Sequence, residues 1–258
     1  MNLIALISCF CLPSIWAHAT PQRVITTSPT LTEMLYDLGG ESRLVATVEF
    51  SDYPEAAKKI PRIGNFFAPS IERTLLYRPD LVLVDGAARN SQYEVALSRL
   101  GIAKEVIEIS TLKSFHEESV RITNLLGLEK VPSVYKTEEN QPSFSYLGFA
   151  WTSPAIVFTS RTFLHALVES VGGKSLVQFK SEQEYLTVSE EWLILQKPDV
   201  VFLLIEDDSQ KKDFIQFCKR IWRNQMPKVI FLPSRTFARK TETAISEIKK
   251  VAMEIHAK

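Results

Sequence analysis

The side chains that most often carry out chemistry are few and widely separated in this sequence. Beyond residue 19 the histidines are His116, His165 and His256, and none has the H-x-H or H-E-x-x-H spacing of a metal site. Cys218 lies in an apolar, helix-like stretch, which favours a buried thiol over a nucleophile. No G-x-S-x-G, Walker A or G-x-G-x-x-G motif follows an apolar run. The sequence therefore favours binding over catalysis, with no metal and no resident cofactor.

An internal repeat sets two glutamates in equivalent positions. Ser70-Ile71-Glu72 is followed by Pro79-Asp80, and Ser189-Glu190-Glu191 is followed at the same spacing by Pro198-Asp199, with an offset of 119 residues from Glu72 to Glu191. In each copy the Ser can cap a helix and the Glu suits the positive N-terminal end of the helix dipole. Pro-Asp then ends the helix in a turn before an apolar strand. The repeat predicts two similar halves.

The order of expected elements is strand, helix, strand, helix in both halves, which predicts an α/β fold of two Rossmann-like lobes with parallel sheets. Thr27-Ser28-Pro29 and Thr152-Ser153-Pro154 each end an apolar run, and each is expected to be followed by a helix that closes on Gly-Gly. Strands are expected at Val24–Thr26, Val45–Val48, Leu81–Val84, Val106–Ile109, Phe144–Trp151, Val200–Leu204 and Val229–Leu232. Helices are expected at Thr30–Leu38, Ser91–Leu100, Leu112–Leu126, Phe163–Val171, Lys212–Trp222 and Glu242–Ala257.

The lobes are expected at residues 20–126 and 143–258, with a connector at 127–142 that carries Pro132. Two lobes joined by one segment create a cleft, and ligands bind beyond the carboxyl ends of parallel strands. A ligand cleft is therefore predicted between the lobes.

The amino-acid composition indicates where in the cell the protein acts and which class of partner is disfavoured. The chain has 258 residues, 30 Lys and Arg against 30 Asp and Glu, and a formal net charge of +0, which argues against nucleic acid as a partner. Residues 1–19 carry none of these charges and end in Ala17-His18-Ala19, so a signal peptide cleaved after Ala19 is predicted. A lipoprotein anchored at Cys9, in Leu6-Ile7-Ser8-Cys9, is the alternative. After cleavage we expect a periplasmic protein that does not insert into the membrane.

Several short motifs occur in order along the chain. They are Arg23–Glu33 (RVITTSPTLTE), Ser51-Asp52-Tyr53-Pro54, Pro61-Arg62-Ile63-Gly64, Ser70–Glu72 with Pro79–Val82, Phe158-Thr159-Ser160, Gly172-Gly173 and Val188–Glu191. Together they resemble the periplasmic cobalamin-binding proteins of ABC importers, substrate-binding proteins whose lobes are joined by a helical backbone. The resemblance extends over nearly the whole chain after residue 19. It implies capture of cobalamin and its delivery to inner-membrane permease subunits, without catalysis.

The resemblance also implies which side chains contact the ligand. In this family aromatic faces from both lobes enclose the corrin and its nucleotide loop, which requires large rigid rings. Tyr53 matches the family Tyr of Ser-Asp-Tyr-Pro, and Phe66 and Tyr185 occupy equivalent positions of the two repeats. Trp151 and Phe237 are expected in loops after second-lobe strands, facing the cleft.

Glu72 and Glu191 match the two family glutamates that dock against arginines of the membrane subunits. Exposed carboxylates in a two-fold arrangement suit a symmetric partner, because each can accept a bidentate Arg. The alternative is that each Glu only complements the dipole of its own helix.

Two departures from the family pattern bear on the ligand. The connector of about 15 residues, interrupted by Pro132, is shorter than the family's long backbone helix. Arg235 stands near the place where some relatives carry an acidic residue, and it suits an anionic ligand group. The open alternatives are a haem or iron–siderophore binding protein, and a secreted corrinoid-processing α/β enzyme.

Overall fold

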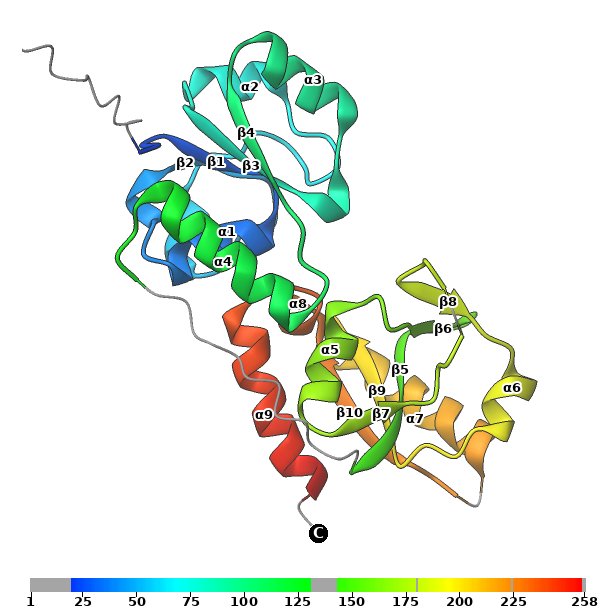
Figure 1. The fold of residues 1–258 in the computed structure, drawn as a ribbon. Coiled ribbons are helices and arrows are strands. Elements are labelled where there is room, and N and C mark those ends of the chain that lie inside the picture. Colours follow the sequence, from blue (N-terminus) through cyan, green and yellow to red (C-terminus); the bar gives the residue numbers. More distant parts are fainter. Residues whose placement is uncertain (1–19, 131–142, 180, 224, 257–258) are drawn as a thin grey trace, which may run out of the picture.

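Two α/β lobes, each built around its own sheet, lie one above the other in Figure 1. The computed structural model describes residues 20–130, 143–179, 181–223 and 225–256. The predicted signal peptide at 1–19, including Cys9, lies outside these ranges, as do residues 131–142 of the predicted connector with Pro132.

The first lobe contains a parallel sheet with strand order β2-β1-β3-β4. Leu31, Leu83 and Ile107 are buried with α1 and α4 on one face, whereas Val82 and Leu97 are buried with α3 on the other. The elements are β1 (Val24–Thr26), α1 (Pro29–Asp37), β2 (Leu44–Ala46), α2 (Ile71–Leu76), β3 (Leu81–Asp85), α3 (Ser91–Arg99), β4 (Ala103–Ile107) and α4 (Leu112–Leu126), with single 3-10 turns at Glu41–Arg43, Glu55–Lys59 and Gly86–Ala88.

The second lobe repeats this plan, with β7, β5, β9 and β10 side by side and parallel as β2, β1, β3 and β4 are. Its elements are β5 (Phe144–Thr152), β6 (Ala155–Phe158), α5 (Phe163–Ser170), β7 (Gly173–Ser175), β8 (Tyr185–Thr187), α6 (Glu190–Leu195), β9 (Val200–Ile205), α7 (Ser209–Trp222), β10 (Lys228–Pro233), α8 (Ser234–Phe237) and α9 (Glu242–His256). The predicted two-lobe α/β fold is confirmed.

The second sheet is mixed, whereas the sequence predicted parallel sheets throughout. β5 is nine residues long, while its counterpart β1 has three. Its first half pairs with β7 in parallel, and its second half folds back into β6, which pairs antiparallel with both β5 and β8. Thr152-Ser153-Pro154 therefore forms the turn of a hairpin, and the predicted helix that follows it and closes on Gly172-Gly173 is α5, which begins only after β6.

The helix that follows the first strand is capped by a hydroxyl side chain in both lobes. Ser28 caps α1, as predicted, by accepting a hydrogen bond from the Leu31 N–H at 3.1 Å. In the second lobe the corresponding cap is Thr162, whose hydroxyl accepts from the His165 N–H at 3.2 Å. In the second lobe the helix begins later after the first strand than in the first lobe, because the hairpin strand β6 lies between them.

The repeated Pro-Asp pair has the same role in both lobes. The Asp80 carboxylate accepts hydrogen bonds from the backbone N–H groups of Gln22 at 2.7 Å and Arg23 at 3.0 Å. The Asp199 carboxylate accepts from the Ser145 N–H at 2.7 Å. Each Asp thus ties the start of the strand that follows the repeated helix, β3 or β9, to the residues at the start of the first strand of its lobe, β1 or β5.

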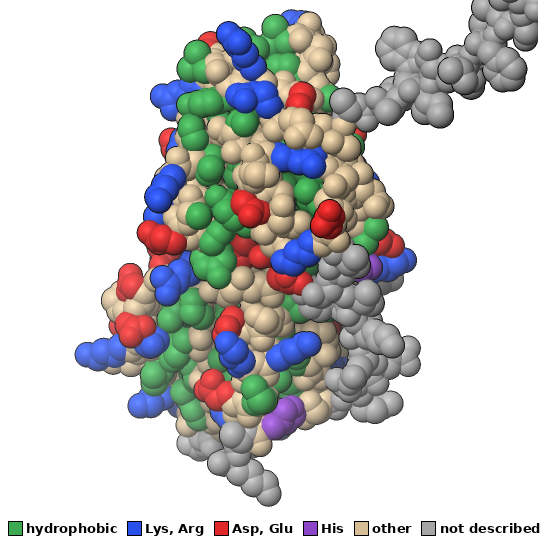
Figure 2. Space-filling model, turned by 90° about the vertical axis from the view of Figure 1, so that its left-hand side faces the viewer, with side chains coloured by type: hydrophobic (Ala, Val, Ile, Leu, Met, Phe, Trp, Pro, Cys, Tyr) green, Lys and Arg blue, Asp and Glu red, His purple; other side chains and the backbone are tan. Residues whose placement is uncertain are grey.

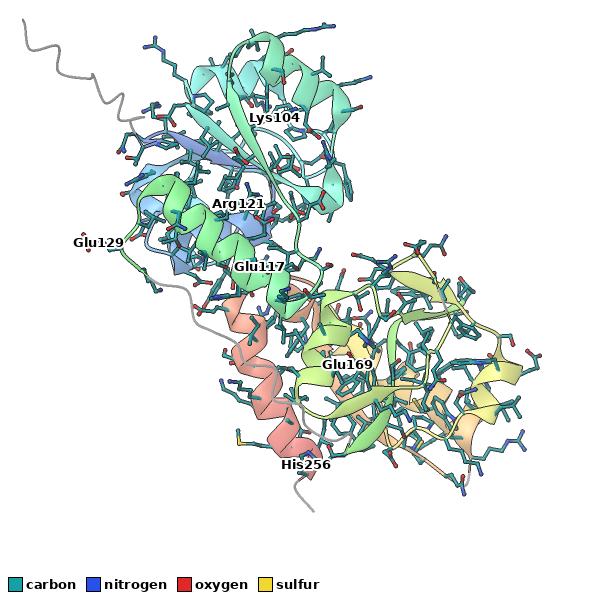
Figure 3. The ribbon with its side chains drawn as sticks, viewed as in Figure 1. Lys104, Glu117, Arg121, Glu129, Glu169 and His256 are labelled. Atoms are coloured by element: carbon teal, nitrogen blue, oxygen red, sulfur yellow. The ribbon has the colours of Figure 1, made fainter. Side chains whose placement is uncertain are left out.

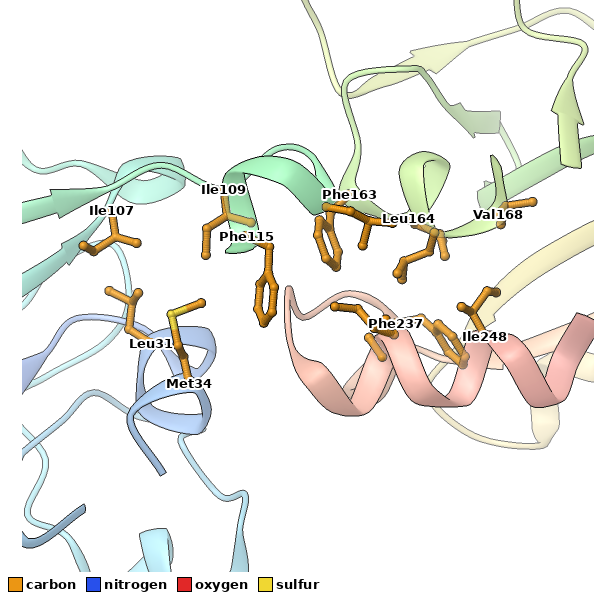
Figure 4. Close-up of a cluster of buried hydrophobic side chains, with 14 of the residues drawn as sticks. Leu31, Met34, Ile107, Ile109, Phe115, Phe163, Leu164, Val168, Phe237 and Ile248 are labelled. Atoms are coloured by element: carbon orange, nitrogen blue, oxygen red, sulfur yellow. The ribbon is translucent and has the colours of Figure 1, made fainter. Parts of the chain in front are cut away.

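One hydrophobic core runs through both lobes (Figure 4). Phe115, near the start of α4, lies between Met34 of the first lobe and Phe163 of α5, with 5.9 Å between the two phenylalanine ring centroids. Phe237 and Ile248 continue the core along α8 and α9. The lobes are therefore joined by packed side chains as well as by the chain connection.

The surface shown in Figure 2 carries acidic and basic side chains interspersed with one another, as a net charge of +0 leads one to expect. Within the described residues, every helix is too short or too polar to span a bilayer.

Candidate ligand-binding cleft

A cavity of about 590 Å³ lies where the two lobes face each other. Asp52 and Tyr53, which follow β2, line it from the first lobe, and Arg235 and Thr236, which follow β10, line it from the second. The carboxyl ends of both sheets therefore open into one cleft, where ligands of α/β folds bind.

The loop that carries Tyr53 is held in place by a chain of hydrogen-bonded, buried hydroxyl groups. The Thr32 Oγ1 lies 2.7 Å from the Thr26 Oγ1 and 2.6 Å from the Thr47 Oγ1, and the Ser51 Oγ lies 3.0 Å from the Thr47 Oγ1. All four side chains are buried. Because each hydroxyl both donates and accepts, the chain of bonds fixes the position of Ser51 and of the residues after it.

Arg62 holds the same loop from its side. Its guanidinium donates to the backbone carbonyls of Ser51 at 3.0 Å and Ile60 at 2.7 Å, and it lies 3.4 Å from the Asp52 carboxylate. The predicted motifs Ser51-Asp52-Tyr53-Pro54 and Pro61-Arg62-Ile63-Gly64 thus form one unit that presents Tyr53, whose exposed fraction is 49%, to the cleft.

Arg239 connects the lobes at the back of the cleft. Its guanidinium donates to the Phe50 carbonyl at 3.2 Å and lies 3.7 Å from the Glu33 carboxylate. Glu33 is 2% exposed, and its Oε1 has no hydrogen-bond partner among the described residues. Arg239 of the second lobe is therefore paired with the buried carboxyl group of Glu33 in the first lobe.

A second carboxyl group lies one helical turn further along α1, beside a small cavity that Phe115, Lys130 and Glu242 also line. Burial first, and then the nearby carboxylates of Glu33 and Glu242, raise the pKa of Asp37 to about 7, while Lys130 acts in the opposite direction. The junction between the lobes thus contains an acid that titrates near neutral pH.

Phe66 and Phe67 are presented by a turn whose first residue is Asn65. The Asn65 side-chain oxygen accepts from the N–H groups of Phe67 at 3.0 Å and Ala68 at 2.8 Å. The two rings meet edge to face with 4.9 Å between centroids. Phe66 is half-buried, whereas Phe67 is 71% exposed, so Phe67 offers the larger free face.

The second-lobe aromatics that the sequence singled out do not line the cavity. Trp151 is exposed at the end of β5, where its indole N–H donates to the Ser153 carbonyl at 3.0 Å. Tyr185 is exposed on β8. Phe237 is buried in the core shared by the lobes, rather than facing the cleft as expected, because α8 turns its side chain inward.

The structure therefore brings Tyr53 and Arg235 to one cavity, whereas Phe66, Trp151 and Tyr185 are not among the residues that line it. Sequence reasoning missed Phe67 and Arg239. The dipeptide Phe66-Phe67 after Asn65 was a usable signal for Phe67. Nothing local marks Arg239, whose partners are about 190 residues away in the chain.

Glu72 and Glu191 lie in the first turns of α2 and α6, and both are exposed. Ser70 and Ser189 cap these helices, accepting from the third residue's N–H at 3.2 Å in each. Backbone N–H groups first, and the capping hydroxyls second, lower the pKa of both glutamates. Both are therefore ionised at neutral pH, and neither has a cationic partner among the described residues.

Two expectations for single residues are confirmed. Cys218 is fully buried, and burial raises the pKa of its thiol to about 12. His165 belongs to α5, where its Nδ1 lies 2.8 Å from the Tyr146 hydroxyl and its Nε2 lies 3.1 Å from Glu169, the residue labelled on α5 in Figure 3. Burial lowers the pKa of His165, so the ring is a neutral core group.

Residues 24–99 match the model of a protein family that is described as periplasmic binding protein. A vitamin B12-binding protein of Vibrio campbellii is 28% identical over 217 residues, covering 75% of this chain and 76% of that protein. A vitamin B12-binding protein of Photorhabdus laumondii is 22% identical over 255 residues, covering 93% and 90%.

Solved structures extend the likeness to both lobes. The periplasmic vitamin B12 binding protein of Vibrio cholerae superposes with a TM-score of 0.72 at 22% identity, covering 92% of this chain and 97% of that one. A periplasmic heme binding protein of Pseudomonas aeruginosa superposes with a TM-score of 0.74 at 18% identity, covering 92% and 94%. The predicted resemblance is thus confirmed: the chain has the two-lobe fold of these periplasmic binding proteins, and residues 24–99 of its first lobe match the family model.

Proposed function

We propose that this chain is a periplasmic solute-binding protein that captures cobalamin between its lobes and delivers it to an inner-membrane ABC importer. The observation that carries the proposal is the position of Tyr53, on a braced Ser-Asp-Tyr-Pro loop that lines the inter-lobe cavity. The relatives named as vitamin B12-binding proteins support cobalamin as the ligand. No bond is made or broken, and no resident cofactor is needed.

The ligand is held chiefly by aromatic faces. Tyr53 lines the cavity, and in this proposal the exposed rings of Phe67, Trp151 and Tyr185, with the half-buried Phe66, supply further aromatic surface when the ligand is bound. Large rigid rings suit a flat macrocycle because they bury much area with little loss of side-chain entropy.

Haem is the second candidate, and the arginines of the cleft favour it. Arg235 and Arg239 both line the cavity, and guanidinium groups pair well with carboxylates such as the propionates of haem. Several proteins of similar structure are named as heme-binding. Asp52 and Glu55 also line the cavity and oppose an anionic ligand.

Delivery requires a surface that meets the membrane subunits. Glu72 and Glu191 supply it in this proposal, because they are ionised, exposed and related by the internal repeat. Each would meet an arginine on one half of a two-fold symmetric importer.

The test is a visible absorption spectrum of the purified mature chain after incubation with cobalamin and desalting. We expect one equivalent of unmodified cobalamin to elute with the protein. Elution of colourless protein after cobalamin, but of a haem spectrum after parallel incubation with haem, would transfer the assignment to the second candidate.

A further inference from the structure

Each lobe exposes a pair of adjacent apolar side chains at the end of one short helix. Leu75 and Leu76 of α2 are 44% and 74% exposed. Ile194 and Leu195 of α6 are 57% and 76% exposed. The two pairs are separated by the same 119 residues as the glutamates, so the internal repeat extends to them.

Helix geometry places each pair next to a glutamate. Residues four apart lie on the same face of a helix, so Leu76 lies beside Glu72, and Leu195 lies beside Glu191. The inward faces of the helices are occupied by the buried residues Thr74 and Leu193, which are also 119 apart. The outward faces therefore combine an ionised carboxylate with an uncovered leucine in both lobes.

Leu76 and Leu195 differ from most other leucines of the described chain in their exposure. Most leucines of the described chain pack in the cores, whereas Leu76 and Leu195 leave about three quarters of their surface in water. Exposed apolar groups that recur at equivalent positions of two lobes indicate a contact surface rather than chance exposure. Beside Leu75, an apolar groove of about 650 Å³ between α2 and α3 enlarges this surface.

The charge of the surface indicates the kind of partner. A membrane surface rich in anionic lipids would repel Glu72 and Glu191, since such surfaces attract Lys and Arg. A second copy meeting the first across a two-fold axis at one of these helices would bring like carboxylates together, which is unfavourable. A different protein with a cationic group beside an apolar one fits both features.

We infer that Glu72 with Leu75 and Leu76, and Glu191 with Ile194 and Leu195, form two matched docking patches for two identical membrane subunits of the importer. Each subunit presents an arginine or lysine next to an apolar side chain. In this arrangement the glutamates steer association and the apolar pairs slow dissociation, because exposed charges act mainly on association and buried apolar contacts on dissociation. The inference rests on the proposed function, and it adds the residues that hold the complex together.

The test uses the mature chain and the importer of its own cell, purified and reconstituted in proteoliposomes. The double variant Leu76→Ser, Leu195→Ser is compared with Glu72→Gln, Glu191→Gln and with a control, Met253→Ser, which alters a residue that is 67% exposed on α9. Association and dissociation rates are measured at two salt concentrations. Thermal stability and cobalamin binding are measured on the same samples.

We expect the leucine variant to dissociate at least tenfold faster, with its association rate, ligand affinity and melting temperature close to those of the wild type. The glutamine variant should associate more slowly and lose its salt dependence, and the control should behave as the wild type. Unchanged dissociation of the leucine variant would overturn the inference.

Two other results would also overturn it. One is equal binding of the wild-type chain to importer-free vesicles containing phosphatidylglycerol, which would assign the patches to lipid. The other is a wild-type dimer in sedimentation that the leucine variant abolishes. Failure of the proposed function is separate, since it would appear as a wild-type chain that binds no cobalamin.

Discussion

At the scale of single residues, the side chain of Tyr53 in the cleft is positioned by buried hydroxyl groups and by Arg62. Tyr53 is exposed, but the loop below it is held by the Thr32–Thr47–Ser51 hydroxyls and by Arg62. The sequence motif identified Tyr53 through resemblance. It did not indicate the supporting bonds, because these join residues up to 21 positions apart that only the folded chain brings together.

Removing the Tyr53 ring should weaken cobalamin binding. We expect Tyr53→Ala to cost about 1–3 kcal/mol of binding free energy, the scale for a large contact face. Tyr53→Phe, which keeps the ring, should cost less than about 1 kcal/mol because the hydroxyl is half in solvent. Isothermal calorimetry on both variants gives the comparison, and equal affinities for Ala and wild type in a folded protein would remove Tyr53 from the site.

Asp37 makes stability depend on pH in a defined direction. Its folded-state pKa of about 7 exceeds its ordinary value, so the folded protein binds the proton more tightly than the unfolded chain. The protonated carboxyl therefore stabilises the fold at low pH, and this contribution is lost as the pH rises from about 4 to about 7.

Asp37→Asn should abolish that loss. We expect the variant to be more stable than wild type by about 1 kcal/mol at pH 8, because partial solvent exposure reduces the full effect of a shift of this size. At pH 4 the advantage should vanish. Melting curves of both proteins from pH 4 to pH 8 measure the difference, and a constant gap between them would contradict the assignment.

At the scale of helices and strands, much of the fold could be predicted because the apolar runs and caps are local signals. The predicted bounds of Val24–Thr26 and Leu112–Leu126 coincide with β1 and α4, and the repeated Ser residues cap α2 and α6 as expected. β6 and β8 were not predicted as strands. The hairpin at Thr152-Ser153-Pro154 depends on the pairing of β6 with β8, which lies about 30 residues further along the chain.

The helix-start glutamates allow docking to be separated from stability. Glu72→Lys with Glu191→Lys should leave cobalamin binding nearly intact while uptake is abolished, because like charges across the importer interface cost several kcal/mol. If the glutamates only complement their helix dipoles, each change should cost ~0.3–1 kcal/mol of stability, and uptake should fall only with the folded fraction. Uptake, melting temperature and ligand affinity of the double variant distinguish the two cases.

At the scale of the whole molecule, packed side chains join the two lobes. Phe115, Phe163 and Phe237 are buried where the lobes meet. The sequence predicted two lobes and a cleft. It could not predict that the cores merge, because no local pattern shows which helix faces meet another lobe.

Truncating Phe115 should weaken the coupling between lobes. We expect Phe115→Ala to cost about 3–5 kcal/mol, as for other buried phenylalanines, and to split thermal unfolding into two transitions. Phe217→Ala, which removes a ring from the core of the second lobe alone, is the matched control and should lower stability without separating the lobes. Differential scanning calorimetry measures both, and a single transition in Phe115→Ala would show that the lobes are coupled elsewhere.

The central claim is that the cleft between the lobes binds cobalamin and releases it unchanged. Its most direct test is calorimetric titration of the mature chain with cobalamin and, separately, with haem, followed by mass analysis of the released ligand. The account predicts saturable one-to-one binding of cobalamin, weaker by about 1–3 kcal/mol in Tyr53→Ala, and recovery of the intact ligand. The absence of heat with cobalamin alongside saturable binding of haem would contradict it.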